Sequence, residues 1–536
     1  MTKHQNNKQA IRLPIYISIA IVMGIFIGAE TAPRKRDAQQ SFNKLKQILT
    51  YIENDYVDEV STEGLVEGVV EDMLKKLDPH TSYISQEDNV ILRSQLEGNF
   101  EGIGIEFNIF KDTIYVIAPL SGGPSIKAGL RPGDKIIKVD DEIVAGKGFT
   151  NRDVIQRLRG EKGSEVQLSI KRNGRKDLMS FQITRDVIPQ YSVDVAYMVD
   201  ENTGYIKVSR FSATTYMEFK EALIGLLDQG MDRMILDLTG NPGGYLDRAV
   251  DMVDEFIEDN RLIVYTKGKE SRYNERHFSK NGGDFEKGSL IIMIDEGSAS
   301  ASEIVTGAIQ DHDRGIVVGR RSFGKGLVQL PISLDDGSEL RLTISRYYTP
   351  SGRSIQKPYT DAKAYQNDFQ ARIESGELLS ADSIKVDESL VFQTKKGRTV
   401  YGGGGIVPDV FVPIDTSQNN ILLNQLFSTN TLAEFAVEVF ESRRSFFEKM
   451  EVQEFIDEFE VSNDMLADLV AAAQSNGMQV SINDLSTNNE DIKLYLKAFI
   501  GRSGWNDDAF YPVINQTNEI YLSALTLFEE ADALVH

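Results

Sequence analysis

Apolar and polar positions follow three different patterns along the chain, and each pattern predicts a different kind of domain. From residue 38 to 95, apolar residues recur every three or four positions, which is the spacing of amphipathic helices. From about Gly98 to residue 186, short apolar runs alternate with glycine turns, which is typical of strands. Beyond about residue 417 a helical spacing returns in an acidic sequence. We therefore predict a multidomain chain that is helical at both ends.

The middle of the chain alternates short apolar runs with amphipathic stretches. Residues 203–209 and 234–238 have the length and branching of strands, and residues 215–229 between them have helical spacing. A further helix is expected at 245–257 and a buried strand at 289–294. This alternation predicts a sheet covered by helices, so the expected fold class is α/β, or mixed α+β over the whole chain.

The small residues after the last of these strands mark a turn that could carry a nucleophile. The sequence GSASASE occupies 297–303, and Ile304, Ala308 and Ile309 then follow at helical spacing. Ser300 therefore lies near a helix start, where several N–H groups have no intrahelical partner. A hydroxyl there can act as a nucleophile, and the free amides can bind an oxyanion. The alternative is that these serines only cap a helix.

A lysine between two glycines is the second candidate for chemistry. Lys325 follows strand-like residues 316–318, which would run beside the strand at 289–294 and end at the same edge of the sheet. A lysine can be a general base only if burial lowers its pKa, and Gly324 and Gly326 would let the backbone approach closely. The alternative is a solvated lysine in a glycine turn.

Together with other motifs, these two stretches resemble the C-terminal processing proteases, the Ser/Lys-dyad peptidases of family S41 that are also called tail-specific proteases. The resemblance covers roughly residues 40–415, and several long motifs in the family's order are more specific than any single glycine-rich match. The motifs are LDPHTSY (77–83), DLTGNPGG (237–244), GSASASE (297–303), SFGKGLVQ (322–329), RYYTPSGRSIQ (346–356) and VYGGGGIVPD (400–409).

The resemblance implies roles for individual residues of the expected catalytic core. The core would have the α/β fold of crotonase-like and ClpP-like proteins, with Ser300 as the nucleophile and Lys325 as the general base. Gln329 would position the lysine. The resemblance implies no metal and no other cofactor.

The same resemblance implies an oxyanion hole made of two backbone amides. One amide would come from Ala301, and the other from Gly243 or Gly244, between which the sequence does not choose. The chemistry needs two preorganised donors aimed at the tetrahedral oxygen. The alternative for the glycine pair is a plain turn.

Residues 97–188 resemble a PDZ domain. Gly102, Ile103, Gly104 and Ile105 match the loop that binds a peptide carboxylate in such domains. Consecutive N–H groups of a glycine-rich loop suit a chain terminus, and the bound peptide adds as a strand alongside. The alternative is an internal tether that binds nothing.

Other titratable residues near the motifs are weaker candidates. His312 would lie roughly 18 Å from Ser300 along a continuous helix, which excludes it as the base of a Ser-His-Asp triad. The same distance favours a structural role for Asp311. Glu303 is expected to cap the helix start or to make a local hydrogen bond, and His80 to be a structural turn residue.

Composition limits the choice of function without deciding it. The 536 residues are 41% hydrophobic, which leaves room for two or three domains with a large core. The net charge of −23 argues against nucleic acid as a partner. The chain has no cysteine, which excludes disulfides, a thiol nucleophile and cysteine-based zinc sites.

The first residues predict a signal anchor or a signal peptide. Lys3, Lys8 and Arg12 precede an uncharged apolar stretch at 13–29, which is close to the shortest length that spans a membrane. The basic cluster at 34–36 is unusual after a cleaved signal, so we favour a retained anchor. Basic residues on both flanks do not fix the orientation of this stretch. The resemblance implies an extracytoplasmic location, on the periplasmic side, with the chain anchored in the cytoplasmic membrane.

The patterns and the resemblance together define the expected domains. The helical extension could cover the core, mediate dimers or hold an adaptor, and its sequence does not choose among these roles. The domains are an N-terminal signal segment (1–37), a helical segment (38–96), the PDZ-like domain (97–188), the protease core (189–416) with a polar insertion at about 359–394, and a helical extension (417–536).

The resemblance implies a serine endopeptidase that cleaves proteins near or from their C-termini through an acyl-enzyme. The PDZ-like domain would recruit substrate tails. Two alternatives remain: a non-catalytic scaffold that binds tails, and an enzyme gated by its PDZ-like domain or by a partner. Expected partners are proteins with accessible C-termini, with an adaptor or a second copy of the chain also considered, and no nucleic acid.

Overall fold

The computed structural model contains two compact units, Met1–Leu77 and Asp78–His536. The residues that the structure describes are 33–120, 122–172, 174–280, 282–415, 421–481 and 489–535.

The first unit consists of helices over its described part. These are α2 (Pro33–Asp55) and α3 (Thr62–Leu74), and the hydroxyl of Ser61 caps α3 by accepting from the N–H of Gly64. The apolar stretch expected to form an anchor, residues 13–29, lies outside the described residues. Among helices in the described ranges, none is long and apolar enough to cross a membrane.

The second unit begins with a short strand and a helix that lead into the PDZ-like domain. These are β1 (Ser82–Ile84) and α4 (Gln86–Glu97), and α4 ends at Gly98 in the left-handed conformation (φ 74°). Strand β2 (Asn99–Gly102) then pairs with β9 (Asp186–Pro189) in a two-stranded antiparallel sheet. The chain therefore enters and leaves the PDZ-like domain through paired strands.

The PDZ-like domain is an antiparallel sheet in the order β3-β4-β5-β7-β8, with β6 paired to β5. Apolar residues at alternate positions of its strands meet in one core, as strand periodicity predicts. Strand β3 lies at an edge of the sheet. The elements are β3 (Ile105–Phe110), β4 (Thr113–Pro119), α5 (Pro124–Ala128), β5 (Lys135–Val139), β6 (Glu142–Ile143), α6 (Asn151–Leu158), β7 (Glu165–Lys171) and β8 (Met179–Thr184).

The protease core is built on a six-stranded sheet in the order β10-β11-β12-β15-β16-β21. All neighbours are parallel except β10 and β11. Each residue of β11 and β15 is buried, because helices cover both faces of the sheet. The strands are β10 (Val193–Met198), β11 (Thr203–Val208), β12 (Arg233–Asp237), β15 (Ser289–Ile294), β16 (Ile316–Gly319) and β21 (Val410–Phe411).

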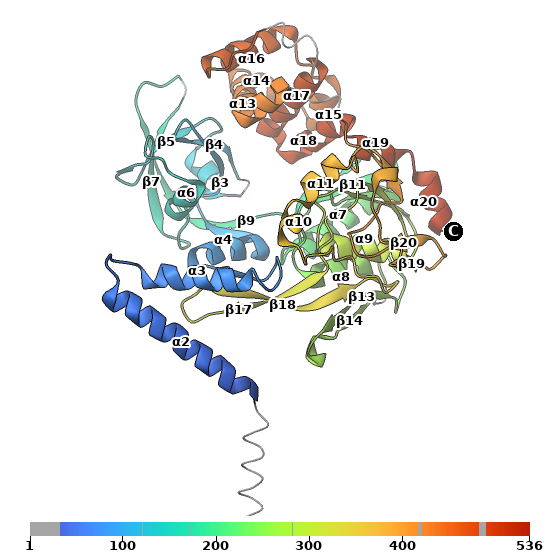
Figure 1. The fold of residues 1–536 in the computed structure, drawn as a ribbon. Coiled ribbons are helices and arrows are strands. Elements are labelled where there is room, and N and C mark those ends of the chain that lie inside the picture. Colours follow the sequence, from blue (N-terminus) through green and yellow to red (C-terminus); the bar gives the residue numbers. More distant parts are fainter. Residues whose placement is uncertain are drawn as a thin grey trace, which may run out of the picture. The chain divides into compact units, whose positions relative to one another are not determined.

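Two groups of helices form the outer layers around this sheet (Figure 1). Helices α7 (Thr215–Asp228), α8 (Leu246–Asp254) and α9 (Ala301–Asp311) share one apolar core with one face. Helices α19 (Glu519–Leu525) and α20 (Phe528–Val535) pack on the other face through residues such as Tyr521. The end of the chain therefore covers the core, one of the roles considered for the extension.

A second sheet of the core has the order β1-β18-β13-β14, and β17 pairs with β18. The long β17–β18 hairpin follows Lys325 directly and carries Gln329 and Tyr347. It therefore places two motif segments of the resemblance, 322–329 and 346–356, side by side. The strands are β13 (Leu262–Gly268), β14 (Arg276–Phe278), β17 (Leu327–Ser333) and β18 (Glu339–Tyr348), with the 3-10 turn η1 (Ser271–Tyr273) before β14.

The polar insertion packs on the loop that precedes Lys325. The guanidinium of Arg321 pairs with Glu377 at 2.6 Å, and Arg372 donates to the carbonyl oxygens of Arg321 and Ser322. The insertion thus supports the lysine loop. Its elements are α10 (Ala362–Gln366), α11 (Asp368–Glu374), η2 (Ala381–Ser383) and β19 (Val391–Gln393), and β19 pairs with β20 (Thr399–Tyr401).

The helical extension before α19 forms a bundle with its own apolar core (Figure 1). Phe447 is fully buried there, and aromatic rings surround it. The helices are α12 (Ile421–Ser428), α13 (Thr431–Ser442), α14 (Arg444–Phe447), α15 (Val452–Glu458), α16 (Asn463–Ser475), α17 (Asn489–Trp505) and α18 (Asp507–Ile514), followed by η4 (Asn515–Thr517).

Candidate active site

Ser300 lies at the turn between β15 and α9, as the sequence pattern predicts. Its backbone has φ 56° and ψ −111°, a conformation that is strained for any residue with a Cβ atom. The turn leaves Ser300 at the start of a helix whose eleven residues are all buried. Strain of this kind is common where a fold holds a nucleophile in a fixed position.

Lys325 follows β16, which is parallel to β15 and adjacent to it. Both strands therefore deliver their following loops to the same edge of the sheet. Burial lowers the pKa of the Lys325 ammonium, and the nearby charge of Arg341 lowers it further. The charges of Glu303 and Asp78 oppose this shift.

Ser300 and Lys325 line one cleft of about 750 Å³. Gln329 and the glycine pair Gly243 and Gly244 line it too, so the cleft contains the candidate residues from three separate motifs. Apolar side chains of α4 and β17 form much of its wall. The cleft can accommodate an extended polypeptide beside the serine hydroxyl.

The side chains of the candidate dyad are not hydrogen-bonded to each other in this conformation. Within the described part of the chain, no hydrogen bond of 3.5 Å or less joins Ser300 Oγ to Lys325 Nζ, and Lys325 Nζ has no other such bond there. The amide nitrogen of Gln329 instead lies 3.5 Å from the hydroxyl of Thr343. The positioning role expected for Gln329 is therefore not formed in this conformation.

The buried carboxylate of Glu303 joins the two motifs through their backbones. Its Oε2 accepts from the N–H of Ser300 at 2.8 Å and from the N–H of Lys325 at 2.9 Å. Its Oε1 accepts from the hydroxyl of Ser322 at 2.5 Å and from the N–H of Gly324 at 2.7 Å. Burial raises the pKa of Glu303, and these four donors oppose that shift.

Glu303 does more than the local helix capping expected from its sequence position. It does bond to the N–H of Ser300, which is the capping interaction. Its bonds to the lysine loop are tertiary, and spacing within one helix gives no signal for them. The clue in the sequence was a carboxylate among the small and apolar residues of 301–309, and the structure shows that the whole helix is buried.

Tyr347 is a second residue that sequence reasoning missed. Its buried hydroxyl donates toward the carbonyl oxygen of Lys325 at 2.5 Å and lies 3.1 Å from that of Ser300. The hydroxyl therefore bonds to the backbone of Lys325 and lies next to the backbone of Ser300. Its place inside the 346–356 motif was the available signal.

The glycine pair lies directly against the start of α9. A Cβ atom at Gly243 would be 2.7 Å from Ser300 Cβ and 2.8 Å from the amide nitrogen of Ala301. The N–H of Gly243 donates to Asn241 Oδ1 at 2.8 Å. The N–H of Gly244 has no acceptor among the described residues. In this conformation Gly244 and Ala301 are the pair with available amides.

The remaining candidates lie where the sequence placed them. His312 lies at the far end of α9, where its Nε2 is 2.7 Å from the carbonyl oxygen of Leu262. Asp311 is fully buried and pairs with Arg353 at 2.8 Å, which is a structural contact. Burial is the main cause that lowers the pKa of His80 to about 4, and the charge of Lys325 lowers it further.

The loop expected to bind a peptide carboxylate precedes the edge strand β3. Gly104 has φ 71°, and Ser125 donates from both its N–H and its hydroxyl to the carbonyl oxygen of Ile103. These bonds fix the loop from Gly102 to Ile105 against α5. The open edge of β3 has backbone groups that can pair with an added strand.

Nothing in the described residues suggests a metal centre: no group of three or more histidine, aspartate or glutamate side chains there could hold an ion.

Family models match several stretches of the chain. The Peptidase family S41 model matches residues 202–363, and a PDZ domain model matches 102–183. The Activating protease CtpB N-terminal domain matches 27–88, and a family of unknown function, DUF8443, matches 422–506. The last match falls on the helical bundle.

The chain is also similar to whole proteins of known class. The carboxy-terminal-processing protease of Bartonella bacilliformis is 34% identical over 350 residues, which cover 63% of this chain and 80% of that protein. The carboxy-terminal processing protease CtpB of Bacillus subtilis is 34% identical over 333 residues, 61% of this chain and 68% of that protein.

Among solved structures, the photosystem II D1 C-terminal processing protease is 25% identical over 70% of this chain and 87% of that chain, with a TM-score of 0.36. The family models and the two relatives agree with the motifs in the cleft. The chain therefore belongs to the carboxy-terminal processing proteases of peptidase family S41 and is a serine-type peptidase with a PDZ domain.

Proposed function

We propose that the chain is an endopeptidase that cleaves protein substrates through a dyad of Ser300 and Lys325. The observation that supports this most is the bond of one carboxylate oxygen, Glu303 Oε2, to the backbone N–H groups of both residues. These bonds hold the two backbones next to each other at the edge of one cleft.

In the proposed reaction, the neutral amine of Lys325 takes the proton of Ser300 as Oγ attacks the scissile carbonyl carbon. The amides of Gly244 and Ala301 stabilise the negative oxygen of the tetrahedral intermediate. The intermediate collapses with breakage of the peptide C–N bond, and the proton held by Lys325 passes to the leaving amine. A water molecule then attacks the ester, and the same lysine again transfers the proton.

We assign the recruitment of substrate tails to the PDZ domain. Support comes from the open edge of β3 beside the loop Gly102–Ile105, which offers amides for a terminal carboxylate and a strand edge for the residues before it. A substrate held there by its tail would present upstream residues to the cleft.

The test is the turnover of an unfolded protein by variants of the dyad. Ser300→Ala and Lys325→Ala should each lower kcat/KM by at least about 10³-fold, because the nucleophile or its base is lost. Ser380→Ala and Lys363→Ala, at exposed positions of the insertion, are the matched controls and should retain wild-type rates. Undiminished cleavage by either dyad variant would refute the assignment.

A gated enzyme is the second candidate function, and one observation favours it. Ser300 and Lys325 lack a mutual hydrogen bond, and Gln329 is turned toward Thr343. A resting state would then need an event that reorients these side chains. Hydrolysis of a short reporter peptide should accelerate when a second peptide with a free C-terminus is added; a rate that is maximal without it excludes this gating.

A further inference from the structure

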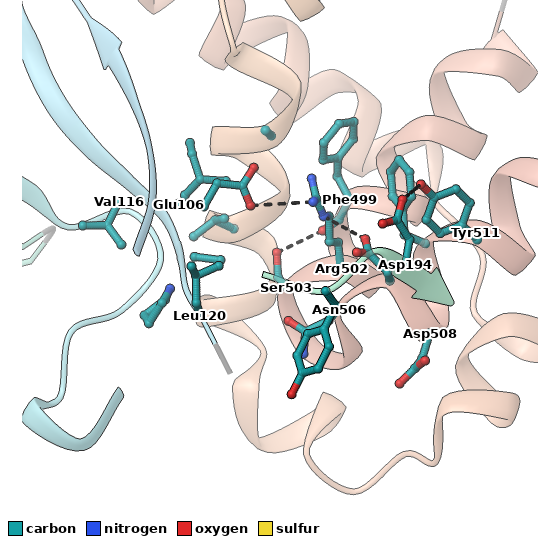
Figure 2. A pocket seen from close by; sticks show the side chains of 18 of the residues that line it. Glu106, Val116, Leu120, Asp194, Phe499, Arg502, Ser503, Asn506, Asp508 and Tyr511 are labelled. Carbon is teal, nitrogen blue, oxygen red and sulfur yellow. Dashed lines mark hydrogen bonds and ion pairs between the residues drawn. The ribbon is translucent and has the colours of Figure 1, made fainter. Parts of the chain in front are cut away.

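A second hollow, of about 590 Å³, lies outside the catalytic cleft (Figure 2). We call it the outer pocket. Strand β4 of the PDZ domain forms one wall, the start of the protease core a second, and helices α13, α17 and α18 of the extension a third. Figure 2 shows Leu120 of the PDZ domain facing Arg502 and Ser503 of α17.

The outer pocket borders the catalytic cleft. Ser209 and Arg210, at the end of β11, line both hollows. The two hollows therefore adjoin at these residues. An extended polypeptide that leaves the cleft past them would enter the outer pocket. Position alone thus favours a segment of the peptidase's own substrate as the occupant, rather than an unrelated ligand.

The outer pocket carries an excess of negative charge. Its lining has five carboxylates, those of Glu106, Asp194, Glu434, Asp507 and Asp508, against the guanidinium groups of Arg210 and Arg502. Arg502 is already engaged, at 3.6 Å from Glu106 and 3.2 Å from Asp507. A concave site of one charge sign concentrates ligands of the opposite sign.

Two of the lining residues have buried acceptor atoms without a donor. Gln190 Oε1 and Glu434 Oε1 are both shielded from solvent and have no hydrogen bond to any residue that the structure describes. A buried acceptor without a donor costs free energy, and a side-chain movement that brings either oxygen to an N–H group of a ligand would recover it. An ammonium, a guanidinium and a backbone amide all supply such donors.

Apolar lining residues complement the charged ones. They include Leu120 on the PDZ side and Phe499 on α17, both labelled in Figure 2. Lysine and arginine side chains have long apolar stems behind their charged ends, so a pocket with apolar walls and acidic groups suits them.

We propose that the outer pocket is a substrate exosite that binds a lysine- or arginine-bearing segment of an unfolded protein whose scissile bond lies in the catalytic cleft. This proposal rests on the proposed function. It gives the helical extension, which matches a family of unknown function, a role in substrate selection through the residues of α13, α17 and α18. The outer pocket would recognise positive charge on an extended chain.

The test compares two unfolded substrates that differ only in charge. Both have the same unstructured C-terminal tail, with three lysines in one and three glutamines in the other, and the triplet is moved stepwise away from the cleavage site. For at least one placement, the wild-type full-length chain should show a kcat/KM about ten-fold higher for the lysine tail. This preference should fall as salt is added.

The variant Glu434→Gln/Asp508→Asn removes two charges with nearly isosteric changes and leaves the ion pairs of Arg502 intact. It should reduce the lysine preference to less than about two-fold. The matched control is Glu458→Gln/Asp468→Asn, the same chemical change at exposed positions of the same extension, and it should keep the full preference. The preference is the ratio of the two kcat/KM values, lysine tail over glutamine tail, measured with one protein. A variant that loses activity equally on both tails therefore keeps its preference.

Three outcomes would overturn the exosite. The first is no lysine preference at any placement, and the second is a preference that the Glu434→Gln/Asp508→Asn variant retains. The third comes from binding of the fluorescent lysine tail to the Ser300→Ala protein: if free spermidine competes as tightly as the unlabelled tail, the pocket binds a small polyamine.

The binding arm also separates this proposal from the proposed function. If the wild-type chain cleaves neither tail, the peptidase assignment fails, whereas anisotropy of the lysine tail still reports on the pocket. Binding to Ser300→Ala that the added Glu434→Gln/Asp508→Asn changes weaken at least about ten-fold would support the exosite. Equal binding of the lysine tail to Ser300→Ala with and without the Glu434→Gln/Asp508→Asn changes would be a fourth outcome that refutes the exosite.

Discussion

The carboxylate of Glu303 accepts a hydrogen bond from the backbone N–H of Lys325 at 2.9 Å, although 22 positions separate the two residues in the sequence. The same oxygen also bonds to the N–H of Ser300. An acidic residue without a direct part in the chemistry thus fixes the relative position of the two candidate catalytic backbones. Its loss should affect the rate more than the fold.

Glu303→Gln should lower kcat by at least about 100-fold while the protein still folds. Glutamine offers one acceptor oxygen where the carboxylate offers two, and its NH₂ group would face N–H donors. We expect a loss of about 1–3 kcal/mol in the free energy of unfolding, since buried donors lose their acceptor. Steady-state kinetics and urea unfolding measure the two effects.

Glu388→Gln, at an exposed position of the insertion, is the control and should change neither quantity. A Glu303→Gln enzyme with wild-type kcat would show that the carboxylate does not position the dyad.

The pH dependence of kcat/KM should report the ionisation of Lys325. A general base must be neutral, and burial lowers the pKa of Lys325 from its ordinary value of 10.5. The rate should therefore rise about ten-fold per pH unit on the acid side and level off below pH 10.5. A profile of kcat/KM on an unfolded substrate between pH 6 and 10 measures this limb.

Lys325→Arg provides the matching variant, because a guanidinium stays protonated throughout this range. It should be inactive at every pH, and no rising limb should remain. Activity of Lys325→Arg that follows the wild-type profile would assign the limb to another group.

Hydrophobic periodicity predicted much of the catalytic core because local sequence determines it. The runs that become β15, α9 and β16 have the expected lengths, and their order placed Ser300 and Lys325 at one sheet edge. Parallel neighbours force this result, since the loops after two such strands leave from the same side.

Tertiary contacts could not be predicted in this way. Amphipathic spacing indicated that the last helices bury a face, but not that α19 and α20 bury it on the core sheet. Likewise, the bond of Asn241 Oδ1 to the N–H of Gly243, which leaves the N–H of Gly244 available, depends on a side-chain orientation that spacing does not encode. The roles of individual site residues remain predictions.

His80 should make the folded state less stable as the pH falls. Burial is the main cause that lowers its pKa to about 4, whereas an unfolded chain has the ordinary value of 6.5. Below pH 6.5 the unfolded state therefore binds a proton that the folded state does not, so stability falls as the pH decreases from 6.5 to 4. Above pH 6.5 this contribution is constant.

The His80→Gln variant should lose this part of the pH dependence. Between pH 6.5 and 4, its unfolding free energy should fall less steeply than that of the wild type, by up to about 1.4 kcal/mol per pH unit. Urea unfolding at several pH values gives both slopes. The variant also loses the hydrogen bond to the Tyr365 hydroxyl, so only the slopes are compared. Equal slopes would show that His80 titrates normally in the folded state.

Gly243→Ala should strongly reduce activity because the new methyl group would clash with the catalytic turn. Gly240→Ala serves as the control, because it strains the backbone without such a clash. Gly243 has φ +95°, and its new methyl group would lie 2.7 Å from Ser300 Cβ and 2.8 Å from the amide nitrogen of Ala301. Gly240 has φ +67°, but a Cβ atom there meets nothing within 4 Å. Both substitutions therefore strain the backbone, by about 1–2 kcal/mol each, and only Gly243→Ala also displaces the nucleophile and the oxyanion amide.

We expect the Gly240→Ala enzyme to keep most of the wild-type kcat and the Gly243→Ala enzyme to lose at least about 100-fold in kcat, measured on the same unfolded substrate. If both variants lost the same modest fraction of kcat, the close packing of Gly243 against Ser300 would have no role beyond backbone conformation.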